Sequence, residues 1–152
     1  MKRNFYLIVV VLFFASCTNP LYNKMKEISD AKWDMNCPMK FDVEVNDTTK
    51  LWDFYVLIRH NTDYAWSNLY TFVTTISPDD SIKTDTIEFI LSYPDGKWVG
   101  KGYGDILSNE ILISKNFVFP EKGLYTFEFQ QGMRDSILVG ICDFGIRITP
   151  SK

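Results

Sequence analysis

Residues 51–59 read Leu51-Trp52-Asp53-Phe54-Tyr55-Val56-Leu57-Ile58-Arg59. Every second side chain of this stretch, from Trp52 to Ile58, is large and apolar. Successive side chains of a β-strand point to opposite faces of a sheet, so a period of two predicts a strand with one buried face. We expect the face that carries Trp52, Phe54, Val56 and Ile58 to form part of a core.

The same signal recurs along the chain. Further strands are predicted at residues 41–45, 69–76, 84–91, 111–119, 124–130 and 137–148. Turn-forming residues separate them, as in Ser77-Pro78-Asp79-Asp80 and Pro94-Asp95-Gly96. Short strands without a long helix are typical of a sandwich. We therefore predict an all-β, antiparallel β-sandwich, immunoglobulin-like or jelly-roll, with about seven to eight strands.

The predicted core consists of the alternate side chains that face inward from these strands. In the last strand the alternation of inward and outward side chains shifts by one residue near Asp143. One extra residue in a β-bulge explains the shift, and the nearby Gly140 and Gly145 fit such a bend. The side chains expected to be buried and to face one another across two sheets are Trp52, Phe54, Val56, Ile58, Tyr125, Phe127, Phe129, Val139 and Ile141.

The N-terminus has the pattern of an export signal. Met1-Lys2-Arg3 is basic, and residues 5–15 form an apolar run that is shorter than the roughly 20 residues of a membrane-spanning helix. The run ends in Phe14-Ala15-Ser16-Cys17, which resembles the lipobox of bacterial lipoproteins and implies acylation of Cys17. We thus expect a lipoprotein signal peptide at 1–16, a lipidated tether at 17–36 and a β-sandwich domain at 37–152.

Composition excludes some classes of protein. The chain is 46% hydrophobic and 23% charged, which is typical of a folded globule. Its formal net charge is −3 and its isoelectric point is near 5.1, and the basic residues are scattered. Nucleic acid is therefore not an expected partner.

No catalytic or metal-binding motif is visible. His60 is the only histidine, so a nucleophilic triad or a multi-histidine zinc site would have to rely on it alone. No nucleophile motif accompanies it, and we expect a surface histidine at a strand end. The sequence predicts a protein that is not an enzyme and has no cofactor.

Two cysteines remain after Cys17. Export to an oxidising compartment permits a disulfide between Cys37 and Cys142. The alternative is a pair of thiols that never meet, and only their distance decides between the two.

Four aromatic residues lie in expected loops or at strand ends, namely Tyr64, Trp66, Trp98 and Tyr103. They allow two interpretations. If exposed, they would form a face that stacks on sugar rings, as in a carbohydrate-binding module. If buried, they plug the ends of the core, with partners for their N–H and O–H groups.

Several segments resemble the gliding-motility lipoprotein GldH family of Bacteroidetes. They span nearly the whole mature domain: Arg59-His60-Asn61, Tyr64, Ser67-Asn68-Leu69-Tyr70, Pro94-Asp95-Gly96-Lys97-Trp98-Val99-Gly100-Lys101-Gly102-Tyr103-Gly104-Asp105, Gln131-Gly132-Met133-Arg134 and Leu138-Val139-Gly140-Ile141-Cys142-Asp143-Phe144-Gly145. The resemblance implies a non-enzymatic accessory lipoprotein of the cell envelope whose partners are other envelope proteins. In some Bacteroidetes an acidic run after the lipidated cysteine marks surface export. Its absence here favours the periplasmic face of the outer membrane.

Arg134 is the most informative candidate for an interaction. Its segment connects two expected strands, and we predict a hairpin in which Gly132 takes the unusual backbone angle. The guanidinium either braces nearby carbonyl groups or stands exposed and docks a partner. Trp98 and Tyr103, in the glycine-rich loop, are further candidates for interaction or loop bracing.

Overall fold

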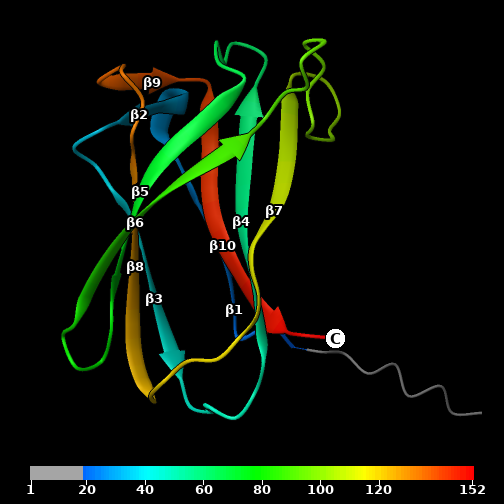
Figure 1. Ribbon diagram of the computed structural model, residues 1–152. Helices are drawn as coiled ribbons and strands as arrows, with labels where there is room; N and C mark the ends of the chain where they lie inside the picture. The colour runs from blue at the N-terminus through cyan, green and yellow to red at the C-terminus, as the bar shows by residue number, and fades with distance from the viewer. Residues whose placement is uncertain (1–18) are drawn as a thin grey trace, which may run out of the picture.

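The computed structural model describes residues 19–152, which form ten β-strands and one short 3₁₀ helix (Figure 1). The predicted signal peptide and the predicted lipidation site, Cys17, lie outside the described residues. Within residues 19–152, none of the helical structure is long and apolar enough to cross a membrane. The elements are β1 (Tyr22–Glu27), η1 (Ser29–Ala31), β2 (Lys32–Asp34), β3 (Met39–Val45), β4 (Trp52–Asn61), β5 (Asn68–Ile76), β6 (Ile82–Ile90), β7 (Ile106–Phe117), β8 (Gly123–Gln131), β9 (Ile137–Val139) and β10 (Ile141–Pro150).

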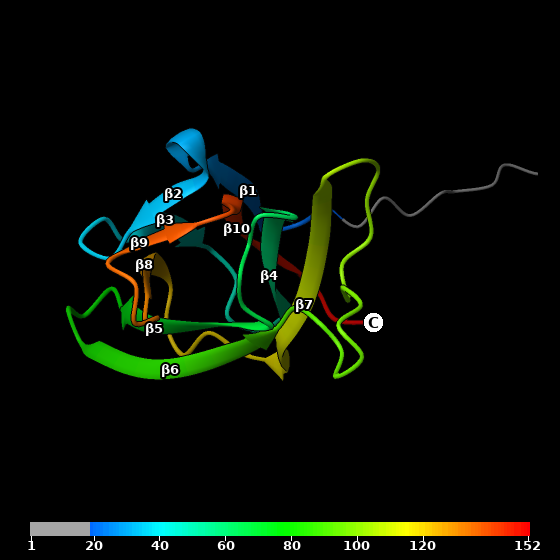
Figure 2. The ribbon, with the colours of Figure 1, turned by 90° about the horizontal axis from the view of Figure 1, so that it is seen from above.

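The strands build two four-stranded antiparallel sheets and a small two-stranded one. The large sheets have the orders β1-β10-β4-β7 and β3-β8-β5-β6, and β2 pairs with β9. Figure 2 shows the large sheets from above as two layers. The first half of the chain pairs with the second half in reverse order: β1 with β10, β3 with β8, β4 with β7 and β5 with β6. This nested pairing is the jelly-roll arrangement, so the predicted antiparallel sandwich is confirmed, and of the two variants left open the chain adopts the jelly-roll.

Aromatic side chains fill the space between the layers. Phe144 lies at the centre, with ring centroids 5.0 Å from Trp33 and Phe129 and 6.4 Å from Phe41 and Phe89. All of the side chains predicted for the core are buried except Val139, which is 48% exposed. The period of two therefore identified the inner faces of β4 and β8 correctly.

The prediction for Val139 was wrong because residues 137–148 form two strands. The backbone breaks at Gly140, whose φ is +100°, and β9 pairs with β2 instead of joining the sheet of β10. On the two sides of this break, side chains of opposite parity face the core, so Leu138 is buried in place of Val139. The predicted bulge is confirmed, since the β10–β4 register shifts between Ile141 and Asp143.

Most of the predicted tether is part of the fold. β1 runs antiparallel to β10 from Tyr22 opposite Ile148 to Glu27 opposite Asp143, and Ile28 and Trp33 are buried. β1 is an edge strand held by main-chain pairing, and it lacks the alternation of a half-buried strand. It approaches closely because β10 has a glycine there: a Cβ on Gly145 would lie 2.5 Å from the Lys24 carbonyl oxygen.

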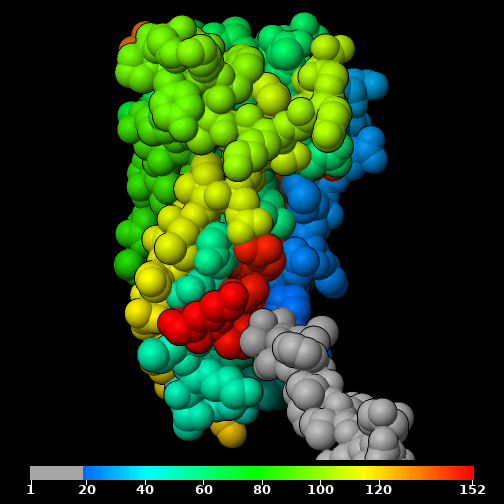
Figure 3. All heavy atoms as spheres, turned by 90° about the vertical axis from the view of Figure 1, so that its right-hand side faces the viewer, coloured from blue at the N-terminus to red at the C-terminus, as the bar shows by residue number. Residues whose placement is uncertain are grey.

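The glycine-rich loop between β6 and β7 covers one end of the sandwich. Figure 3 shows this segment, in yellow-green, above the yellow strand β7. Trp98 forms an isolated bridge with Ser92, and Lys101 forms another with Ser108. The irregular structure predicted around Trp98 and Tyr103 is confirmed.

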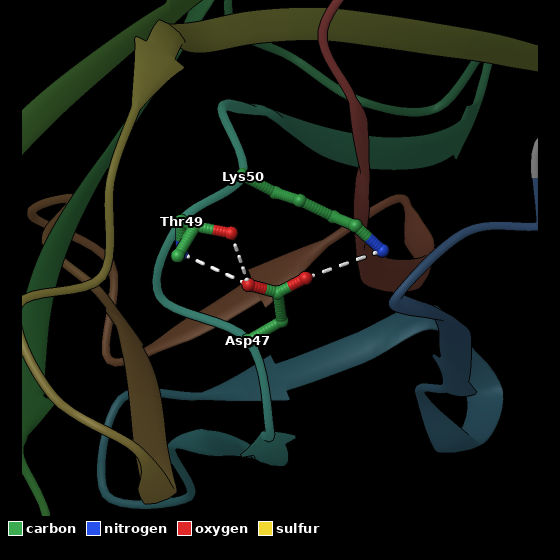
Figure 4. Close-up of polar contacts among 3 residues, drawn as sticks. All are labelled: Asp47, Thr49 and Lys50. Atoms are coloured by element: carbon green, nitrogen blue, oxygen red, sulfur yellow. Dashed lines mark hydrogen bonds and ion pairs between the residues drawn. The ribbon is translucent and has the colours of Figure 1, made fainter.

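In the β3–β4 turn, Asp47 contacts Thr49 and Lys50 (Figure 4). Asp47 Oδ1 accepts hydrogen bonds from the Thr49 amide, at 2.9 Å, and from the Thr49 hydroxyl, at 2.6 Å. Lys50 Nζ lies 3.4 Å from Asp47 Oδ2. The Thr49 hydrogen bonds, and then Lys50, lower the pKa of Asp47. The turn is thus stabilised by its own side chains.

Candidate functional site

The loop that contains Arg134 joins β8 to β9, and Gln131 braces it. Gln131 is buried; its Nε2 donates to the Asp135 carbonyl oxygen at 2.7 Å, and its Oε1 accepts from the Met133 amide at 2.9 Å. Sequence analysis missed this role. The sequence did contain an indication of it. Gln131 follows Tyr125, Phe127 and Phe129 on the buried face of β8, and a buried amide side chain needs polar partners.

Gly132 does not take the predicted backbone angle. The positive φ angles among the glycines belong to Gly96, Gly104, Gly123 and Gly140. A Cβ on Gly132 would lie 3.2 Å from the ring of Phe72, an exposed side chain that would have to shift slightly. The β8–β9 connection therefore lies tightly against the outer face of β5.

A hollow of about 280 Å³ opens beside this loop. We call it the Arg134 pocket; it is lined by Trp66, Asn68, Tyr70, Gly132, Met133 and Arg134. A hydrogen bond links β5 to the β8–β9 loop across the pocket, since the Tyr70 amide donates to the Met133 sulfur at 3.3 Å. Trp66 is 41% exposed and Tyr70 is 38% exposed. The pocket thus presents aromatic and thioether surface to solvent.

The acidic groups around the pocket are already engaged. Asp135 Oδ2 accepts from Trp66 Nε1 at 3.1 Å, and Glu88 Oε1 accepts from Asn68 Nδ2 at 2.6 Å. A hydrogen bond with Glu88 also raises the pKa of Tyr70. Arg134 is exposed, and within residues 19–152 it makes no ion pair or side-chain hydrogen bond. Arg134 therefore makes no bracing contact among the described residues, and its guanidinium lies beside an apolar hollow.

The four candidate aromatic residues do not share one role. Tyr64 is buried, its hydroxyl donates to the Asn68 carbonyl oxygen at 2.7 Å, and burial raises its pKa. Trp98 is partly buried, and its ring centroid lies 4.6 Å from that of His60. Trp66 lines the Arg134 pocket, and Tyr103 is fully exposed. Tyr64 and Trp98 thus plug the end of the core, while Trp66 and Tyr103 stay accessible.

His60 is buried, so the predicted surface position was wrong. The residue continues the inward phase of β4 beyond Ile58, and its ring packs between Trp98 and Tyr64. Nδ1 lies 3.0 Å from the Asn61 carbonyl oxygen, and Nε2 has no partner among the described residues. Burial lowers the pKa of His60 below its ordinary value of 6.5. Because its ring is buried against aromatic side chains, His60 is a core residue.

The buried His60 predicts a pH dependence of stability. The unfolded chain binds a proton near pH 6.5, whereas the folded chain resists it, so the free energy of unfolding should fall as the pH drops below about 6.5. One proton contributes a slope of at most about 1.4 kcal/mol per pH unit. Urea titrations between pH 7.5 and 5 should show this slope. It should be missing in His60→Phe, and an identical slope in both proteins would contradict the assignment.

Cys37 and Cys142 do not form the bridge that sequence analysis left open. Both are free thiols; Cys37 is exposed and Cys142 is partly buried, where burial and Asp143 raise its pKa. Within residues 19–152, no group of three or more histidine, cysteine or acidic side chains could hold a metal ion.

Comparison with known proteins supports the resemblance noted above. The model of the GldH lipoprotein family matches residues 20–148. A protein of Christiangramia forsetii named gliding motility lipoprotein GldH homolog is 33% identical over 155 residues, covering 97% of this chain and 94% of that protein. Gliding motility lipoprotein GldH of Flavobacterium johnsoniae is 30% identical over 149 residues, covering 93% and 92%. No solved structure matches. The chain belongs to the GldH lipoprotein family.

Proposed function

We propose that this protein is a non-enzymatic accessory lipoprotein of the cell envelope that acts by binding another envelope protein. The observation that carries the proposal is Arg134, an exposed guanidinium without a partner in the described chain, beside the apolar Arg134 pocket. Arginine and aromatic residues are enriched among the residues that dominate interface energies. The names of the relatives, which refer to gliding motility, support an envelope role.

The chemistry of the pocket indicates which groups of a partner would bind there. The guanidinium is planar, and its fork of N–H donors matches a carboxylate. Because Asp135 and Glu88 are engaged by Trp66 and Asn68, Arg134 keeps its charge available for an external anion. The hollow beside it has room for an apolar side chain between Trp66 and Met133. A partner segment with a carboxylate next to an apolar side chain satisfies both parts.

The proposal includes the membrane anchor. Acylation of Cys17 would hold the domain at a membrane, most simply at the periplasmic face of the outer membrane, and two or more acyl chains anchor stably where one does not. In Cys17→Ala, incorporation of a labelled lipid precursor should be lost, while the exported wild-type protein carries the label. Equal labelling of the two proteins would refute the anchor.

Arg134→Gln should weaken partner binding at least tenfold, a loss of about 1.4 kcal/mol, without changing the melting temperature. The variant keeps hydrogen-bonding atoms but loses the charge, and the guanidinium makes no ion pair or hydrogen bond within residues 19–152. The lipidated protein would be cross-linked in isolated envelopes, the partner identified from the wild type, and its affinity measured for both proteins.

Gln131→Ala provides the matched control. It removes the internal brace of the same loop and should lower the melting temperature, because the Asp135 and Met133 backbone groups lose their partner. If Arg134→Gln itself lowers the melting temperature and leaves binding unchanged, Arg134 is a structural residue and the docking role is refuted.

A carbohydrate-binding module is the second candidate, because Trp66 and Tyr103 stay exposed. Titration with envelope polysaccharide, followed by tryptophan fluorescence, distinguishes the two. Saturable quenching that disappears in Trp66→Ala but persists in Arg134→Gln would favour sugar binding over protein docking.

A further inference from the structure

The two large sheets stay open along one side. β6 pairs only with β5, and β7 pairs only with β4, so neither strand has a partner across the gap among the described residues. Figure 3 looks onto this side, with the yellow β7 facing the viewer and green strands beside it. The free edge of β6 therefore presents main-chain N–H and C=O groups to any strand that arrives there.

An apolar groove follows this open side. Two adjoining hollows of about 430 and 340 Å³ share Phe117 and Phe127 in their walls. We call them together the β6–β7 groove; besides these two residues, its lining includes Phe54, Ile113 and Phe129, and Lys83, Asp85 and Ile87 from β6. Its walls come from the inner faces of both sheets, so a side chain that enters it reaches the core.

Charged residues mark the rim of the groove on β6. Lys83 and Asp85 lie two positions apart, on the same face as Ile87, and Lys83 Nζ is 2.8 Å from Asp85 Oδ2. Their side chains are 77% and 56% exposed. Inward-pointing charges on an edge strand oppose unspecific pairing. Such an exposed pair adds little to stability, so it can exchange its internal contact for an external one.

We propose that β6 and the β6–β7 groove bind an extended segment of a partner protein, which adds to the sheet as an antiparallel strand. Main-chain hydrogen bonds to β6 supply affinity in such strand addition, and alternate side chains supply specificity. The antiparallel direction follows the rest of the molecule, in which every strand pair is antiparallel within the described residues.

The charges on the rim fix the sequence pattern of the segment. Directly opposite side chains on one face of an antiparallel pair interact. An acidic residue therefore belongs opposite Lys83, a basic residue opposite Asp85, and an apolar residue opposite Ile87, where it enters the groove next to Ile113. Read from its N-terminus, the segment has the order apolar, any, basic, any, acidic. This surface is separate from the Arg134 pocket and does not depend on it.

Two peptides of equal composition test the proposal. The matching peptide is acetyl-Thr-Leu-Thr-Lys-Thr-Glu-Thr-amide, and in the control its lysine and glutamate are exchanged. Amide chemical shifts of the ¹⁵N-labelled domain report the site, and their titration gives both affinities. The matching peptide should bind about fivefold more tightly, with shifts confined to β6, β7 and the groove. The double variant Lys83→Glu, Asp85→Lys should reverse this preference at an unchanged melting temperature.

Other results overturn the proposal. Lack of binding at millimolar peptide, equal affinity of the two peptides, or shifts elsewhere on the domain would each exclude the stated segment. A dimer that depends on Lys83 and Asp85 and excludes the peptide, seen by sedimentation, would place a second copy of the chain on β6 instead.

Discussion

Replacing Phe144 with alanine is expected to lower the free energy of unfolding by about 3–5 kcal/mol. The side chain is fully buried on β10 and contacts aromatic rings from β2, β3, β6 and β8. These rings come from the large sheet that faces β10 and from the small sheet, so the space left by Phe144 cannot close without moving several strands. Urea unfolding followed by near-ultraviolet circular dichroism measures the loss.

Phe144→Leu is the matched control. Leucine keeps most of the apolar volume, so the loss should be clearly smaller than for alanine. If the alanine variant lost less than about 1 kcal/mol, the site would collapse freely and Phe144 would not be the centre of the core.

Gly140→Ala should also destabilise the domain, by more than about 3 kcal/mol. A non-glycine residue at a positive φ costs about 1–3 kcal/mol, and the φ of Gly140 is +100°. In addition, the new Cβ would lie 2.6 Å from the Tyr64 amide nitrogen and 2.7 Å from its Cα. These are backbone atoms, so a side-chain rotation cannot relieve the contact.

Gly104→Ala separates the two causes. Gly104 also has a positive φ, of +64°, but a Cβ there has nothing within 4 Å. The free energy of unfolding of Gly104→Ala should therefore fall only by the cost of the backbone angle, about 1–2 kcal/mol. Thermal unfolding of both variants measures the difference, and equal losses would show that the contact with Tyr64 contributes nothing.

The sequence predicted the elements whose burial alternates along the strand. Trp52 to Ile58 and Tyr125 to Phe129 have one buried and one more exposed face, and the period of two reports this directly. This period did not predict the features that depend on which strands pair with each other. β1 is exposed over most of its length, so its place beside β10 leaves no apolar pattern. Strand order, which distinguishes jelly-roll from immunoglobulin-like topology, is a property of these long-range pairs.

The candidate site was predictable in part for a similar reason. The family resemblance directed attention to Arg134, and its segment does line a pocket. Bracing was one of two roles considered for Arg134, and Gln131 makes the contacts that brace this loop, through the Asp135 carbonyl oxygen and the Met133 amide. The walls of the pocket, Trp66 and Tyr70 against Met133, come from segments more than 60 residues apart, and local spacing does not encode such a contact.

The central claim is that the Arg134 pocket docks an envelope protein, and site-specific photo-cross-linking in intact cells tests it most directly. A photoreactive amino acid would replace Tyr70 in the pocket or, as the control, Met25 on β1, since both side chains are 38% exposed. We predict one dominant cross-linked protein from position 70, lost when Arg134→Gln is added, and no such product from position 25. The same product from both positions, or one from position 70 that persists in Arg134→Gln, would contradict the account.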